Sequence, residues 1–154
     1  MIQRIQSLYL FAACIAMTFT SLMPLGRFLG GVETFRLTAF GLATEDGAMV
    51  IGTIYMAVVL IAATLLPLVT IFFYKKRKVQ LRLCIAEMVL LGGSQIFICF
   101  YLWRAFRGIS GFTPFAFSFS VTSILSIVAF VLVWLAFRAI FKDEVLVKSL
   151  DRIR

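Results

Sequence analysis

Residues 48–78 read AMVIGTIYMAVVLIAATLLPLVTIFFYKKRK, and this stretch decides the fold. Its first part, residues 48–74, contains no charged side chain, whereas residues 75–78 are all basic. About 20 helical residues are needed to cross the roughly 30 Å hydrocarbon core of a bilayer. The stretch therefore predicts a transmembrane helix followed by a basic loop.

Three further apolar runs of sufficient length flank this stretch, at residues 7–25, 83–103 and 117–141. Hydrophobic residues make up 62% of the chain and charged residues 14%, whereas a soluble domain carries about 25% charged residues. We therefore predict an all-α membrane protein. Residues 1–154 form one integral membrane domain, a four-transmembrane-helix bundle with a polar, amphipathic tail at residues 142–154.

The basic residues indicate how this bundle is oriented. Most of the 15 Lys and Arg residues lie in the N-terminal turn, in residues 75–82 and from residue 138 onward. Short loops rich in Lys and Arg remain cytoplasmic, so we expect both termini in the cytoplasm. The net charge of +8 also favours contact with anionic membrane lipids. No basic and aromatic surface module is present, so a nucleic-acid partner is not expected.

The largest polar segment, residues 26–47, is the first loop on the opposite side of the membrane. Gly30 and Gly31 can form a tight turn. After them, apolar and polar residues alternate over residues 34–39, which is the pattern of a strand. We expect a small β-hairpin with strands near residues 27–29 and 32–40.

Two polar residues interrupt the third predicted span. Glu87 lies about one turn inside its cytoplasmic end, and Gln95 lies near mid-depth. A carboxylate inside a membrane is a candidate functional group because burying it unpaired is costly. Arg138 lies at a similar depth in the fourth span, so an intramembrane Glu87–Arg138 ion pair is one interpretation, and a proton- or substrate-handling Glu87 is the other. For Gln95 we expect one interhelical hydrogen bond.

Ser120, Ser123 and Ser126 recur every three residues in the fourth span. Small residues at this spacing form a narrow packing face between helices. The alternative is a polar translocation path. The sequence leaves both interpretations open.

Several classes of activity lack the residues that they require. The chain has no histidine and its three cysteines, Cys14, Cys84 and Cys99, form no CxxC pair. Haem held by two histidines and a zinc centre of the usual kind are therefore excluded. A phosphate-binding loop and a nucleophile elbow are also absent. We predict a protein that is not an enzyme and that has no catalytic, cofactor-binding or metal-binding residues.

Three polar segments resemble one known pattern. They are MIQRIQSLYL at the start, YKKRKVQLRLC at residues 74–84 and RAIFKDEVLVKSLDRIR at residues 138–154. In order and spacing they are similar to a bacterial integral membrane family described only as a domain of unknown function. The resemblance implies a four-helix protein of the bacterial inner membrane and supplies no activity, cofactor or site residue.

All three segments lie on the expected cytoplasmic side, so we expect them to form one composite surface. Its basic residues are candidates for binding a partner or lipid headgroups: Arg4, Lys75, Lys76, Arg77, Lys78, Arg82, Lys148, Arg152 and Arg154. The function that fits best is an accessory or structural subunit that binds another membrane protein or complex. The alternatives are a small oligomeric transporter or channel that uses Glu87 and the serine face, and a lipid- or quinone-binding membrane protein.

Overall fold

The computed structural model describes residues 2–30, 33–74, 76–109 and 116–151. Within them lie four helices: α1 (Ile2–Leu22), α2 (Ile54–Phe72), α3 (Arg77–Ile109) and α4 (Thr122–Asp151). All four are long and apolar enough to cross a membrane. The prediction of four such helices is therefore confirmed, whereas several of the predicted boundaries are not.

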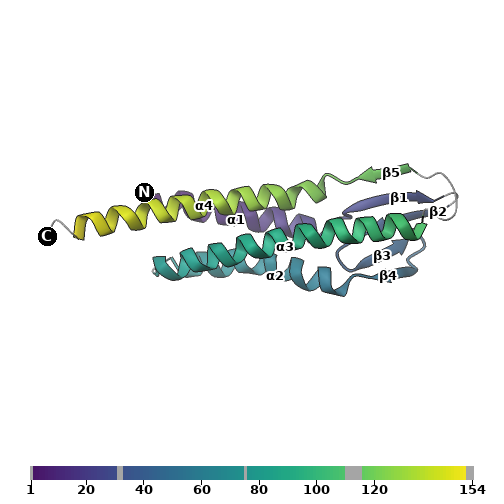
Figure 1. Ribbon diagram of the computed structural model, residues 1–154, viewed down its shortest axis with the longest axis horizontal. Coiled ribbons are helices and arrows are strands. Elements are labelled where there is room, and N and C mark those ends of the chain that lie inside the picture. Colours follow the sequence, from purple (N-terminus) through teal and green to yellow (C-terminus); the bar gives the residue numbers. More distant parts are fainter. Residues whose placement is uncertain (1, 31–32, 75, 110–115, 152–154) are drawn as a thin grey trace.

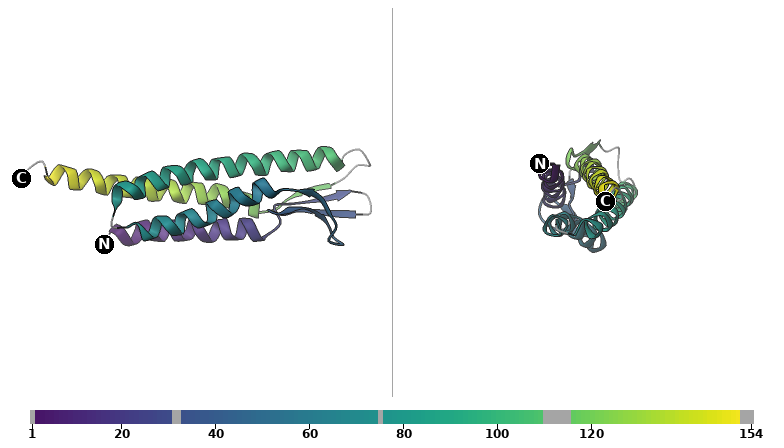
Figure 2. Two further views of the ribbon diagram at one scale, coloured as in Figure 1. Left: turned by 90° about the horizontal axis from the view of Figure 1, so that it is seen from below. Right: turned by 90° about the vertical axis from the view of Figure 1, so that its left-hand side faces the viewer.

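The helices form a closed ring in which each contacts its neighbours in sequence, and α1 also contacts α4. Figure 2 shows this ring end-on. The N-terminus, the connection between α2 and α3, and the last turns of α4 lie at one end of the bundle, which we call the basic end (Figure 1). The last turns of α4 project beyond the other helices there. The opposite end, which carries the strands, is called the sheet end.

The interior of the ring contains several small side chains, and many large apolar side chains cover its outside. Ala13, Ala63, Ala129 and Ala136 have 0% exposure and allow the four helices to approach closely. By contrast, large apolar residues cover the outside of every helix, including Leu8 (63% exposed), Val58 (61%), Val89 (71%) and Ile124 (55%). An apolar exterior of this extent is what lipid-facing helices require, and it far exceeds the patches that soluble monomers expose.

A five-stranded antiparallel sheet closes the sheet end. Its strands are β1 (Gly26–Gly30), β2 (Glu33–Leu37), β3 (Gly41–Thr44), β4 (Met49–Gly52) and β5 (Ala116–Phe119), in the order β4-β3-β2-β1-β5. The predicted hairpin is present as β1 and β2, with Phe28 opposite Phe35. The predicted turn residue Gly31 lies outside the described residues. Between β3 and β4, Gly47 turns the chain with a φ of 85°, a conformation that favours glycine.

The sheet packs against the last turns of α3. Phe28, Leu37 and Leu42 are buried in the same core cluster as Tyr101 and Leu102 of α3, and β1 contacts α3 directly. Since an isolated hairpin is only marginally stable, this contact explains how a small sheet persists. The last turns of α3 extend past the ends of the other helices and lie beside the sheet (Figure 1).

Two predicted spans are wrong at the ends that enter the sheet. The second predicted span began at residue 48, but Met49–Gly52 is β4 and the helix starts at Ile54. The fourth began at residue 117, but Ala116–Phe119 is β5 and the helix starts at Thr122. A short apolar run beside an apolar helix has no periodicity that separates strand from helix. In both places, pairing with a neighbouring strand puts these residues in the sheet and not in the helix.

Candidate functional site

Glu87 lies on the buried face of α3. Gln80, Cys84, Glu87, Leu91 and Ser94 follow one another at intervals of three or four residues, so they lie on one stripe of the helix. Glu87 is 0% exposed, and neither carboxylate oxygen has a hydrogen-bond partner among the described residues. An acidic group is thus enclosed by the bundle without a polar contact of its own.

Cysteine thiols lie near this carboxylate. Cys84 is buried one turn before Glu87 on α3, and Cys14 on α1 is 7% exposed. Both interact electrostatically with Glu87. The Cys14 thiol also lies 3.5 Å from the carbonyl oxygen of Thr64 on α2. Three helices therefore meet around Glu87, although no group of three metal-ligating side chains forms in the described part of the chain.

The predicted Glu87–Arg138 ion pair is absent from the structure. Arg138 is exposed, and its guanidinium carbon lies 5.7 Å from the centre of the Trp134 ring. The buried positions of α4 next to it are Ala136 and Ile140. A residue two positions from each of them points to the opposite side of the helix, so Arg138 lies on the outer face of α4. Among the described residues, the salt bridge that does form joins Arg36 and Glu45 on the sheet.

Buried polar groups continue from Glu87 toward the basic end. Gln80 on α3 is 3% exposed, Gln6 on α1 is 4% exposed and Thr70 on α2 is fully buried. Gln6 donates a hydrogen bond of 2.9 Å to the Asp143 carboxylate of α4. Toward the sheet end, the buried stripe of α3 continues with Leu91 and then Ser94, and Ser123 and Ser126 of α4 are also buried. Buried polar groups thus lie on both sides of Glu87.

The serines of the fourth helix serve in packing. Ser123 donates to the carbonyl of Leu25, at the junction of α1 and β1. Ser126 donates to Oε1 of Gln95 and also contacts the carbonyl of Ser123 at 3.2 Å. Each hydroxyl therefore ties α4 to a neighbouring segment or to its own backbone. These contacts do not support a translocation path along the serines.

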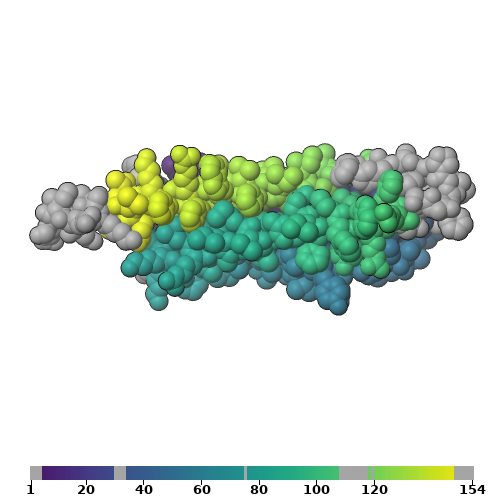
Figure 3. All heavy atoms as spheres, in the orientation of Figure 1, coloured from purple at the N-terminus to yellow at the C-terminus, as the bar shows by residue number. Residues whose placement is uncertain are grey.

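Gln95 makes an interhelical contact through Ser126, and it borders an outer groove. The groove lies between α3 and α4, which run side by side on the face shown in Figure 3. Its volume is about 300 Å³, and it is lined by Leu91, Gly92, Gln95, Ile96, Ser126, Ile127 and Phe130. A side-chain carbon added at Gly92 or Gly93 would meet nothing within 4 Å. The two glycines therefore face outward and do not pack against another helix of this chain.

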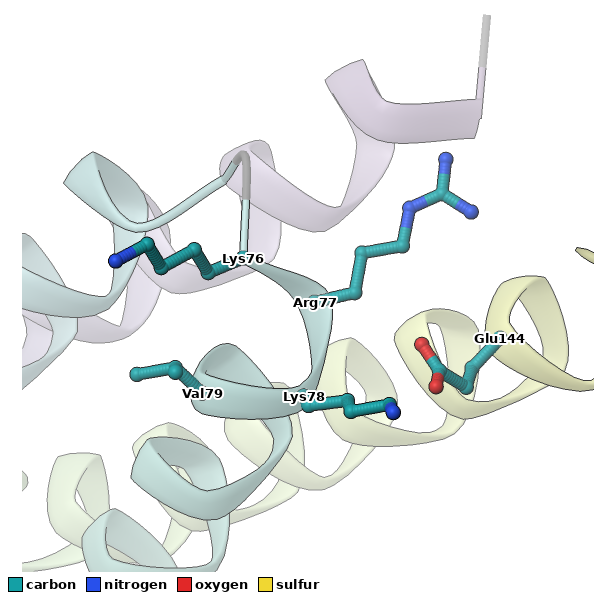
Figure 4. Close-up of a pocket in the computed structure, with 5 residues that line it drawn as sticks. All are labelled: Lys76, Arg77, Lys78, Val79 and Glu144. Atoms are coloured by element: carbon teal, nitrogen blue, oxygen red, sulfur yellow. The ribbon is translucent and has the colours of Figure 1, made fainter.

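A second pocket lies at the basic end. It has a volume of about 440 Å³ and is lined by Lys76, Arg77, Lys78, Val79 and Glu144. Figure 4 shows Lys78 and Glu144 reaching into it from two different helices, α3 and α4. The start of α3 and the tail helix thus meet here, while Gln6 and Asp143 join α1 to α4 nearby. All three segments of the predicted composite surface therefore converge at one end.

Part of the predicted basic surface lies beyond the description. Arg82 is exposed one turn above the pocket on α3. Five of the predicted residues have side chains outside the described part of the structure: Arg4, Lys75, Lys148, Arg152 and Arg154.

Residues 2–153 match a family described as "Domain of unknown function (DUF4293)". The chain belongs to this family. The match covers nearly the entire sequence, so the bundle, the sheet and the tail helix are all parts of the family domain. No curated protein matches the chain.

The sequence did not indicate two features of the site. The proximity of Cys14 to Glu87 depends on how α1 packs on α3, for which the sequence contains no local signal. The outward direction of Gly92 and Gly93 depends on which face of α3 is buried. The buried face of α3 can be read from the spacing of Gln80, Cys84, Glu87 and Leu91. Gly92 and Gly93 lie outside that stripe.

Proposed function

We propose that this protein is a non-enzymatic accessory subunit of the bacterial inner membrane that binds a transmembrane helix of another membrane protein. The observation that carries the proposal is the groove between α3 and α4. Gly92 lines the groove without a side chain, and Gln95 lines it with an amide group. No described residue occupies the space above Gly92.

The depth of the groove in the bilayer follows from the aromatic and basic residues. Arg107 lies over the Trp103 ring of α3 at 4.4 Å, and Arg138 lies near Trp134 of α4. Exposed Trp and Arg gather at membrane interfaces. Since Ser126 contacts Gln95 and the helices are antiparallel, Arg138 lies level with about residue 83 of α3. Residues 83–103 rise about 30 Å, which is one hydrocarbon thickness.

Gln95 lies well inside this interval, so its polar atoms face a medium that offers no water. Its oxygen accepts from Ser126. Its amide nitrogen has one acceptor nearby among the described residues, Cys99 Sγ at 4.0 Å, and sulfur is a weak acceptor. A passing helix with a backbone carbonyl or hydroxyl at this depth would accept from the amide. Small residues such as Gly92 let such a helix approach closely.

The occupant that we propose is a helix of a separate membrane protein. It would present a backbone carbonyl or hydroxyl at the depth of Gln95, whose amide nitrogen has one weak acceptor nearby among the described residues. A second copy of the chain is the alternative outcome of the purification described below.

The same proposal assigns the basic end to the cytoplasm, with both termini on that side. The pocket of Lys76, Arg77 and Lys78 would then lie at the level of the cytoplasmic headgroups, where anionic lipids attract basic residues. The sheet would lie outside the membrane on the opposite side. The five strands form one sheet at one end of the bundle, which supports this arrangement.

This topology predicts which surface thiols an impermeant maleimide reaches. In a background without the native cysteines, Asp46→Cys at the sheet end should react in intact cells. Lys78→Cys at the basic end should react only after the membrane is opened. Both positions are exposed in the structure, so accessibility within the protein is matched. Labelling of Lys78→Cys in intact cells would reverse the proposed orientation.

The function itself is tested by affinity purification of the tagged full-length protein from native membranes in a mild detergent. We expect one membrane protein to co-purify in a fixed ratio, as measured by mass spectrometry. Recovery of a homo-oligomer alone would contradict the proposal. So would a lipid or quinone bound in a fixed ratio in native mass spectra with no protein partner, because that ligand would then fill the groove.

A further inference from the structure

We propose that Glu87 is a proton-binding site inside the bundle. This inference is independent of the proposed function, since the groove lies on the outer face of α3 and α4 and does not include Glu87. The ligand is the proton alone: a carboxylate oxygen binds it to form a neutral carboxyl group, and the reverse step returns it.

The surroundings of Glu87 favour the neutral form. The residue is 0% exposed and both oxygens lack a partner among the described residues. The titratable groups near it are thiols, Cys84 on its own helix and Cys14 on α1. No cation of the described chain compensates it, because Arg138 is exposed on the outer face of α4. An isolated carboxylate in such a setting takes up a proton to avoid an uncompensated charge.

The other helices contribute no charge at their buried faces. The buried positions of α2 in the half of the bundle near Glu87 are Ala63, Pro67 and Thr70. Those of α4 are Val133, Ala136 and Ile140. All are neutral, so the charge state of Glu87 is set by burial and by the two thiols.

The proposal is tested by infrared spectroscopy of the full chain in liposomes of known orientation. At neutral pH the native protein should show the C=O stretch of a protonated carboxyl group, shifted in D₂O. Glu87→Gln should remove this band, whereas Glu144→Gln, at the exposed pocket, should keep it. A rise of pH should bleach the band in the native protein.

Two results would overturn the proposal: absence of the protonated band at neutral pH, or persistence of the band in Glu87→Gln. Should Glu87→Gln not fold, a hydrophobic carbodiimide applied to the native protein gives a second readout. This reagent modifies protonated carboxyl groups in apolar surroundings. Peptide mapping should then place the adduct on Glu87, and the yield should fall as the pH rises. An adduct elsewhere, with Glu87 unmodified, would refute the assignment.

Discussion

Replacement of Glu87 by methionine is expected to raise the free energy of unfolding by about 1–3 kcal/mol, which is the cost of burying a polar group without a partner. Methionine has a similar length and volume, and it needs no hydrogen bond. The carboxyl group of Glu87 has no partner among the described residues, so its loss leaves no group unpaired. The change can be measured by SDS titration of the purified protein in mixed micelles, followed by circular dichroism.

The sign of this effect distinguishes the two interpretations of Glu87. Had it formed a buried ion pair, removal of one partner would leave an uncompensated charge and cost about 3–5 kcal/mol. Glu87→Gln is the matched control, because it keeps the shape and one buried polar group; its stability should stay within about 1 kcal/mol of the native protein. A marked loss of stability in Glu87→Met would show that the carboxyl group has a structural partner.

A gain in stability from removing an acid is typical of functional sites. Natural proteins retain groups that weaken the fold where the group serves a function. The predicted stabilisation by Glu87→Met and the predicted loss of proton binding in Glu87→Gln therefore address the same residue with independent readouts. Stability reports the cost of burial, and infrared spectroscopy reports the protonation state.

The four helices could be predicted from the sequence because the length of an apolar run is a local property. Residues 48–74 are long enough to cross a bilayer whatever they contact. Strands at the sheet end were harder to predict. Met49–Gly52 and Ala116–Phe119 are short and apolar, and each adds to an edge of a sheet whose other strands lie elsewhere in the chain. Pairing of this kind is a tertiary property.

The candidate site was only partly predictable for a related reason. Glu87 and Gln95 stand out as polar residues within an apolar run, so the sequence marks them. The predicted direction of Arg138 was wrong. The buried face of α4 is defined by Ala129, Val133, Ala136 and Ile140, and Arg138 falls between two of them. In lipid-facing helices both faces are apolar, so hydrophobic periodicity does not reveal which face is buried.

The groove between α3 and α4 leads to the second large effect, which is expected for Gly92→Leu. A leucine side chain at this position would enter open space within the monomer, so the bundle should fold and purify as the native protein does. The same side chain would fill the floor of the groove and hold a partner helix away. We expect the amount of co-purified partner to fall at least tenfold, which corresponds to about 1.4 kcal/mol of binding free energy.

Val89→Leu provides the matched control for this variant. Val89 lies nearly one turn earlier on α3, is 71% exposed and does not line the groove. A leucine there enlarges the lipid-facing surface and should leave partner recovery unchanged. Gln95→Leu separates shape from hydrogen bonding: it keeps the floor at Gly92 open but removes the amide donors, at a cost of about 0.6–2 kcal/mol for an intramembrane hydrogen bond. If Gly92→Leu retained the partner while Val89→Leu lost it, the interface would lie on the neighbouring face of α3. Gln95 would then have no role in binding the partner.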